Sequence, residues 1–139
     1  ISSFFFIFIL LSLSSAEYPL YIDELEDLVV GPDRRLLDIL DDDDYMPRNK
    51  VYEKFKVILD RQNEETKNAY QQLVKIKEDR RLAQVERELK YLTAEERKIY
   101  HNIRSIRADL SISEKEAKIK EEEQLRKIRY DSSSEEDDD

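Results

Sequence analysis

The sequence contains no cysteine and no tryptophan, and it has one glycine and three prolines among 139 residues. Without cysteine the chain has no disulfide framework, no thiol nucleophile and no cysteine-bound zinc. A single glycine excludes the glycine-rich loops that bind phosphates. Turn residues this scarce, together with 41% charged residues, are typical of long solvated helices. We therefore predict an all-α fold, a small helical bundle.

Histidine is as scarce as glycine, because His101 is the one imidazole in the chain. Nucleophilic catalysis by a hydroxyl needs a base held beside it, whereas a histidine next to Tyr100 on a charged helix is typical of a protein surface. A carboxylate that acts as a general acid needs a dry pocket, for which so small a core has little room. The composition therefore predicts a protein that is not an enzyme.

The longest apolar run lies at the N-terminus, from Phe4 to Leu11, and is followed by Ser14 and Ala16. A transmembrane helix needs about 20 apolar residues, and this run is shorter. An apolar core followed by small residues two positions apart is the pattern of a secretory signal with its cleavage site. We expect residues 1–16 to be a signal peptide, truncated at its N-terminus. The mature protein is then extracellular, with no stable membrane anchor.

Charge divides the rest of the chain. Residues 17–49 carry eleven acidic and three basic side chains and are expected to form an acidic arm with short helices. Residues 50–130 are expected to form the helical domain, and residues 131–139 a disordered acidic tail. Acidic segments on both sides of the domain would compete with phosphate for its lysines and arginines. The sequence therefore predicts no nucleic-acid partner.

Apolar residues recur at steps of three and four from Val51 onward, which predicts one long helix over about 49–91. Capping boxes at Thr93 and Ser113 predict two further helices, over about 94–109 and 113–130. We expect the isoleucines of the Thr93 helix to face the apolar stripe from Phe55 to Leu73. The predicted core consists of Phe55, Leu59, Leu73, Leu89, Leu92, Ile99, Ile103 and Ile106.

Acidic clusters suggest two further sites. With Asp42 as first ligand, Asp44 falls third and Glu53 twelfth, as in the calcium loop of an EF-hand, but Pro47 takes the place of the glycine that such a loop requires. These three residues are the candidate metal ligands, and a solvated acidic linker is the alternative. In the tail, Ser133 and Ser134 precede acidic residues and are candidates for phosphorylation by acid-directed kinases.

The stretch from Tyr52 to Leu125 resembles the nematode SXP/RAL family, exported helical antigens with an Anisakis-allergen-like cation-binding domain. The family pattern is a charged helix, a Leu-Thr-x-Glu cap, isoleucines, a Leu-Ser cap and an Ala-x-x-Ile helix. The matching places are Phe55 to Leu59, Leu92-Thr93-Ala94-Glu95, Ile103 with Ile106, Leu110-Ser111, and Ala117 to Ile119.

The resemblance implies a secreted nematode antigen that binds divalent cations, calcium or magnesium, weakly and meets host or surface partners. Periodicity alone supports a second hypothesis. The apolar stripe from Leu82 to Leu110 is compatible with an extended coiled coil that dimerises and serves as a structural module of the secretory pathway. The sequence leaves open which partner is bound and whether the chain forms a homodimer.

Overall fold

The computed structural model describes residues 21–134, with side chains up to residue 128. The predicted signal peptide and residues 135–139 of the predicted tail lie outside this part. The described residues form six helices and no strand, which confirms the prediction of an all-α small bundle. The helices are α2 (Ile22–Leu28), α3 (Pro32–Asp41), α4 (Arg48–Asp60), α5 (Glu64–Leu89), α6 (Ala94–Ala108) and α7 (Glu114–Ser134).

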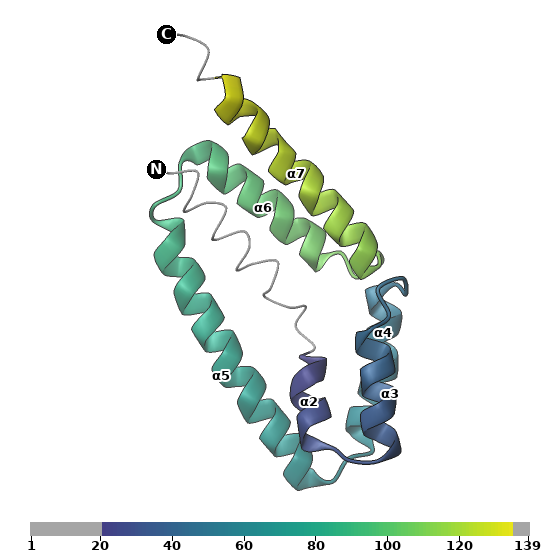
Figure 1. Ribbon diagram of the computed structural model, residues 1–139. Coiled ribbons are helices and arrows are strands. Elements are labelled where there is room, and N and C mark those ends of the chain that lie inside the picture. Colours follow the sequence, from purple (N-terminus) through teal and green to yellow (C-terminus); the bar gives the residue numbers. More distant parts are fainter. Residues whose placement is uncertain (1–20, 135–139) are drawn as a thin grey trace.

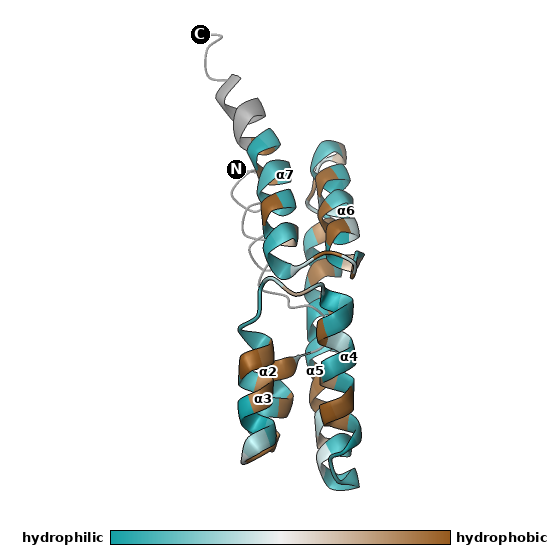
Figure 2. Cartoon of the chain, turned by 90° about the vertical axis from the view of Figure 1, so that its right-hand side faces the viewer, coloured by the Kyte–Doolittle hydropathy of each residue, from teal (hydrophilic) through white to brown (hydrophobic). Residues whose placement is uncertain are grey.

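The molecule is elongated along α5 (Figure 1). With 26 residues, this helix is about 39 Å long. Helices α2, α3 and α4 lie beside one end of α5, and α6 and α7 fold back beside the other end. Figure 2 shows each helix with apolar residues interspersed among hydrophilic ones, as expected of helices that bury one side.

Side-chain caps fix several helix starts. The hydroxyl of Thr93 accepts a hydrogen bond from the amide of Glu96, whose carboxylate accepts from the amide of Thr93, both at 3.2 Å. This is the capping box that the sequence predicts. At the start of α7 the hydroxyl of Ser113 accepts from the amide of Glu116 at 3.1 Å. Helix α7 continues to Ser134, so residues 131–134 of the predicted disordered tail are helical.

The single glycine lies at the N-cap of α3. Gly31 has φ 75° and ψ −145°, a conformation that L residues with a side chain rarely adopt. Pro32 follows as the first residue of the helix, where its fixed φ suits the first turn. No heavy atom lies within 4 Å of the place that a Cβ at Gly31 would occupy. The requirement for glycine therefore comes from the backbone alone.

The prediction of one long helix over 49–91 is wrong. Helix α4 ends at Asp60 and α5 begins at Glu64. Asn63 is the N-cap of α5, because its side-chain oxygen accepts a hydrogen bond from the amide of Thr66 at 2.8 Å. Two glutamates in the first turn of α5 are favourable to the helix dipole. These local interactions start a new helix where the apolar spacing alone suggested continuity.

The first of two hydrophobic clusters contains residues of the predicted acidic arm. That arm does contain two short helices, α2 and α3, and it supplies much of the core. In the same cluster the rings of Phe55 and Tyr70 pack with their centroids 5.6 Å apart. Its buried members are Tyr21, Ile22, Leu25, Val29, Leu37, Leu40, Val51, Phe55, Ile58 and Tyr70.

A second cluster lies at the other end of α5. Its buried members are Val85, Leu92, Tyr100 and Ile103, and Leu89, Ile99, Leu125 and Ile128 pack against them. The expectation that Ile99 and Ile103 face the stripe from Phe55 to Leu73 is therefore wrong. Because α6 turns back after Leu92, its isoleucines pack against the C-terminal half of α5 and against α7.

Candidate binding groove

An apolar groove of about 380 Å³ lies between α3 and α4. This volume falls in the range of sites that receive small ligands or the side chains of a partner. We call it the α3–α4 groove. Its apolar lining comes from Leu36, Ile39 and Leu40 of α3, Met46 of the following loop, and Val57 and Ile58 of α4.

The groove exists because α3 has two apolar faces. Leu37 and Leu40 are buried in the first cluster, whereas Leu36 and Ile39 are 46% and 61% exposed. Across the groove, Val57 of α4 is also 61% exposed. Neighbouring exposed apolar side chains of this kind mark interaction sites. The sequence signal was a second pair of apolar residues, three positions apart, beside the pair that forms the core.

Three charged residues line the edges of the groove: Asp43, Lys54 and Arg61. The carboxylate of Asp43 accepts hydrogen bonds from the amides of Tyr45 and Met46, both at 3.1 Å. Lys54 is exposed and makes no ion pair with any residue that the structure describes. Its ammonium group is therefore available to an acidic group of a ligand.

Arg61, unlike Lys54, has an acidic partner within the described part of the protein. Its guanidinium forms an ion pair with Asp33, and the side-chain amide of Gln62 donates to the same carboxylate at 2.7 Å. Hydrogen bonds from Arg61 and then from Gln62 hold the pKa of Asp33 below its usual value.

The predicted metal ligands do not converge in the structure. Asp42 is exposed, Asp44 is partly buried, and Glu53 is exposed and lies 3.4 Å from the ammonium of Lys50. Pro47, in place of a glycine, is instead the N-cap of α4. Among the described residues, these three carboxylates are not a group that comes close enough to share an ion.

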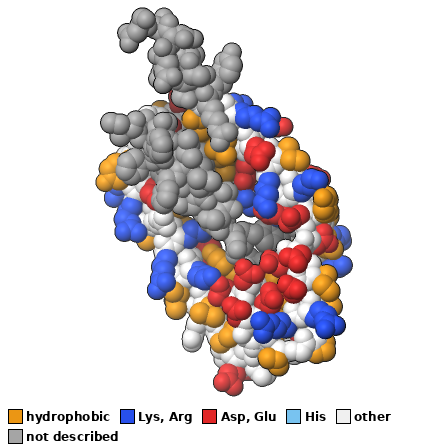
Figure 3. Space-filling view, viewed as in Figure 1, with side chains coloured by type: hydrophobic (Ala, Val, Ile, Leu, Met, Phe, Trp, Pro, Cys, Tyr) orange, Lys and Arg blue, Asp and Glu red, His pale blue; other side chains and the backbone are white. Residues whose placement is uncertain are grey.

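A different acidic group comes together in the described part of the chain. Carboxylate oxygens of Asp23, Glu26 and Asp41 lie within 4.8 Å of one another. Acidic side chains gather over α2 on the surface (Figure 3). Partial burial and repulsion from Asp38 and Asp23 raise the pKa of Glu26. Exposed acidic groups are common without an ion, so cation binding stays a prediction.

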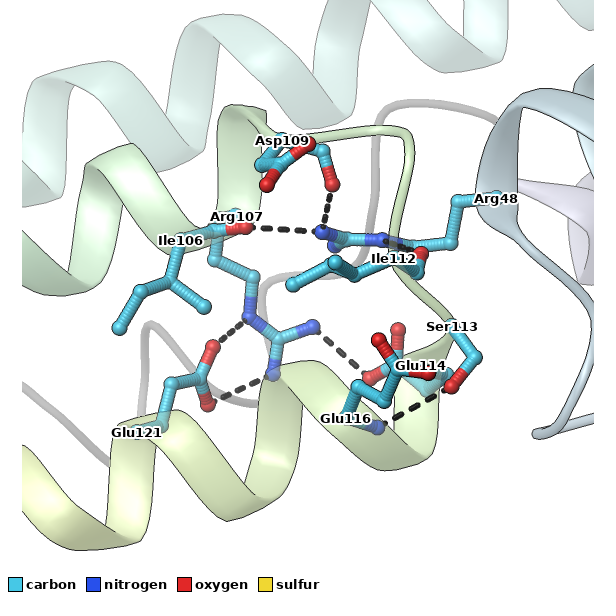
Figure 4. Close-up of polar contacts among 9 residues, drawn as sticks. All are labelled: Arg48, Ile106, Arg107, Asp109, Ile112, Ser113, Glu114, Glu116 and Glu121. Atoms are coloured by element: carbon cyan, nitrogen blue, oxygen red, sulfur yellow. Dashed lines mark hydrogen bonds and ion pairs between the residues drawn. The ribbon is translucent and has the colours of Figure 1, made fainter.

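Arg48 of α4 binds the end of α6 and the loop that leads to α7 (Figure 4). It is 2% exposed although it carries a charge. Its guanidinium donates to the main-chain carbonyls of Ile106 at 2.8 Å, Asp109 at 2.6 Å and Ile112 at 3.3 Å. These carbonyls lie at and after the C-terminal end of α6, where a helix favours a positive charge. No sequence pattern singled out this arginine.

The loops before α4 and α7 also pair through their main chains. Pro47 and Ser113 form an antiparallel bridge, and the amide of Asn49 donates to the carbonyl of Leu110 at 2.8 Å. Nearby, Arg107 pairs α6 with α7 through two glutamates of that helix, Glu114 at 2.8 Å and Glu121 at 2.9 Å (Figure 4). Together with the hydrogen bonds of Arg48, these contacts form a polar junction that joins α4 to α6 and α7.

The remaining predicted residues lie as follows. Ser133 and Ser134 are the last residues of α7, and their side chains lie outside the described part. His101 is exposed, with its ring centroid 5.4 Å from that of Tyr100. Of the predicted core, Phe55, Leu92 and Ile103 are buried, and Leu59, Leu73, Leu89, Ile99 and Ile106 are partly buried.

No protein-family model matches the sequence, and no curated protein or solved structure is significantly similar to it. The resemblance to the SXP/RAL family stays a prediction. Within residues 21–134, no helix is both long and apolar enough to cross a membrane.

Proposed function

We propose that this protein is an exported, non-enzymatic binding protein, and that its α3–α4 groove receives an amphipathic helix of a partner protein. The observation that carries this proposal is the exposure of Leu36, Ile39 and Val57 around one groove. A partner that covers these exposed apolar side chains would remove them from water, and this removal favours binding.

The shape and charge of the groove favour a helix as the occupant. A groove between two packed helices accepts apolar side chains spaced at i, i+3, i+4 and i+7 on one face of a partner helix. Lys54 stands at its edge without an ion pair among the described residues. A glutamate or aspartate beside the apolar face of the partner helix would meet this ammonium group, which favours specificity more than affinity.

Export is supported by the sequence, through the apolar run from Phe4 to Leu11 and the small residues that follow it. The resemblance to the SXP/RAL family supports the narrower proposal of a nematode secreted antigen that binds divalent cations and host or surface partners. In that proposal the partner helix belongs to a host or surface protein.

The coiled-coil alternative fits the structure less well. Its stripe from Leu82 to Leu110 is divided between α5 and α6, which are joined by a turn. Val85, Leu92 and Ile103 of this stripe are buried in the second hydrophobic cluster within one chain. A straight dimer would need these side chains for its interface, but they are used in folding; Leu82 and Leu110 at the two ends of the stripe are exposed.

A peptide-binding experiment tests the groove. A library of amphipathic helical peptides is selected against the protein, and the affinity of the selected peptide is measured by fluorescence anisotropy. Ile39→Asp should weaken binding by about tenfold or more, because it places a charge in the apolar contact. Ile119→Asp is the matched control, since Ile119 is a half-exposed isoleucine of α7 that does not line the groove. Equal binding by the parent and Ile39→Asp would overturn the proposal.

A further inference from the structure

Tyr45 lies in the loop between α3 and α4, directly after four aspartates, Asp41 to Asp44. Its side chain is 73% exposed. Helix α3 ends at Asp41 and α4 begins at Arg48, so the tyrosine lies outside any helix and within reach of an enzyme. An exposed phenol oxygen is a nucleophile, and the carboxylates beside it give the segment a dense negative charge.

Local hydrogen bonds hold Tyr45 in this exposed position. The carboxylate of Asp43 accepts from the amides of Tyr45 and Met46, both at 3.1 Å, which forms a tight turn. On the outer side, the ammonium of Lys115 lies 3.2 Å from the phenol oxygen and 4.6 Å from the ring centroid. Lys115 is itself exposed and belongs to the first turn of α7.

We propose that Tyr45 is a site of O-sulfation by a tyrosine sulfotransferase of the secretory pathway, a modification that rests on the export proposed above. In this reaction the phenol oxygen attacks the sulfur of an activated sulfate, the mixed anhydride of a nucleotide. An S–O bond forms to Tyr45, the S–O bond to the nucleotide phosphate breaks, and the phenolic proton passes to a base of the transferase. No oxidant or reductant is needed.

The acidic segment matches the chemistry of such an enzyme. A transferase that binds a nucleotide phosphosulfate must surround a polyanionic donor with cationic groups. Its acceptor site therefore attracts a tyrosine that has carboxylates beside it. Tyr91 is a natural comparison, because it is 78% exposed but follows Leu89 and Lys90. Exposure alone would mark both tyrosines, whereas the acidic neighbours mark Tyr45.

The sulfate would also have a partner in the fold. A sulfate ester on the Tyr45 oxygen carries a permanent negative charge beside the ammonium of Lys115. Lys115 now donates to a neutral phenol oxygen. After sulfation it would donate to a charged sulfate, and hydrogen bonds between charged groups are stronger. The modified loop would then be tied to the start of α7 and would offer its negative charge to a basic surface of a partner.

Two measurements test the proposal. In the first, secreting eukaryotic cells express the full chain with labelled sulfate in the medium, and label is counted in the exported protein. The parent and Tyr91→Phe should carry label, and Tyr45→Phe should fall to background. Replacing Asp42 and Asp44 by Asn should reduce the label several-fold. In the second, unmodified chain made in bacteria is incubated with a purified tyrosine sulfotransferase and the nucleotide phosphosulfate.

The two measurements separate this proposal from the proposed function. If the chain is exported without label and the purified enzyme does not modify Tyr45, O-sulfation is overturned while export stands. If the chain stays in the cells but the purified enzyme sulfates Tyr45, export is overturned, and with it the modification in cells. A phosphatase-sensitive phosphate on Tyr45 would overturn sulfation in favour of a kinase. Label that persists in Tyr45→Phe would place the modification elsewhere.

Discussion

Arg48 donates a 2.8 Å hydrogen bond from its guanidinium to the main-chain carbonyl of Ile106, across the junction between α4 and α6. Ile106 belongs to the last turn of α6, a helix that contributes to the second hydrophobic cluster, whereas α4 contributes to the first. A buried arginine thus satisfies carbonyls that a helix end leaves without partners. It does so where the start of α4 meets the end of α6 and the loop that follows it.

Replacement of this arginine should destabilise the fold. We expect Arg48→Met to lower the free energy of unfolding by about 2 to 3 kcal/mol, because carbonyls that bond to a charged group are left buried without it. Urea unfolding followed by circular dichroism measures the change. Arg104→Met is the control, since Arg104 is exposed on α6, and it should change stability by less than about 0.5 kcal/mol. Equal effects of the two variants would show that the junction carries no stability.

Truncation of the second cluster should also be costly. Ile103 is buried among residues of α5 and α6. Ile103→Ala should lower the free energy of unfolding by about 2 to 4 kcal/mol, because it removes buried methyl groups and leaves a cavity. Ile119→Ala, at a half-exposed position, provides the comparison. A change below about 0.5 kcal/mol for Ile103→Ala would contradict the packing of α6 against α5.

Alkaline pH should weaken the protein through Tyr21. Burial, and then a hydrogen bond to the carboxylate of Glu78, raises the pKa of Tyr21 from 10.0 to about 12. Between these values the unfolded chain loses the phenolic proton while the folded protein keeps it, so stability falls as pH rises through this window. Urea unfolding at pH 8 and pH 11 should show a smaller fall for Tyr21→Phe than for the parent.

Tyr91→Phe is the control for this effect, because it removes an exposed tyrosine and leaves Tyr21 in place. Its stability should fall between the two pH values as much as that of the parent does. If Tyr21→Phe and the parent lose equal stability, Tyr21 keeps its proton no better in the folded state than in the unfolded one.

Calcium or magnesium should bind weakly, with a dissociation constant of about 10⁻⁴ to 10⁻³ M, as expected of a site without a glycine turn or a full ligand set. Calorimetry on the chain with Asp42 and Asp44 replaced by Asn tests the predicted ligands. The structure supplies a comparison in the other acidic group, with Asp23→Asn and Glu26→Gln together. If only the second variant loses the heat of binding, the ligands are those of α2 and not Asp42 and Asp44. If the parent itself shows no heat of binding, no cation binds.

The sequence predicted the starts of α6 and α7 because capping is local. The box at Thr93 and Glu96 is formed by residues three positions apart, and no tertiary contact is needed to recognise it. The break between α4 and α5 was missed for a related reason. The spacing of three and four from Val51 runs through Gln62 and Thr66, which are polar and do not require a continuous helix, whereas Asn63 between them caps a new one.

The groove and the junction depend on contacts between distant segments, so the sequence could not locate them. Ile39 and Val57 are eighteen positions apart, and only the packing of α3 on α4 brings them to one groove. Arg48 finds its acceptors near Ile112, 64 positions away. For Asp42, Asp44 and Glu53 the spacing was taken from a calcium loop, and a spacing alone does not specify the turn that would bring those carboxylates together.

The backbone at Gly31 makes the fold sensitive to handedness at one position. Its φ of 75° and ψ of −145° are the mirror image of the polyproline II conformation that L residues favour. Chemical synthesis with D-alanine at this position should therefore raise the free energy of unfolding by about 0.4 to 1 kcal/mol, since the unfolded chain loses freedom and the folded chain gains no strain. L-alanine at the same position should destabilise by more than that amount, although its methyl group would enter open space.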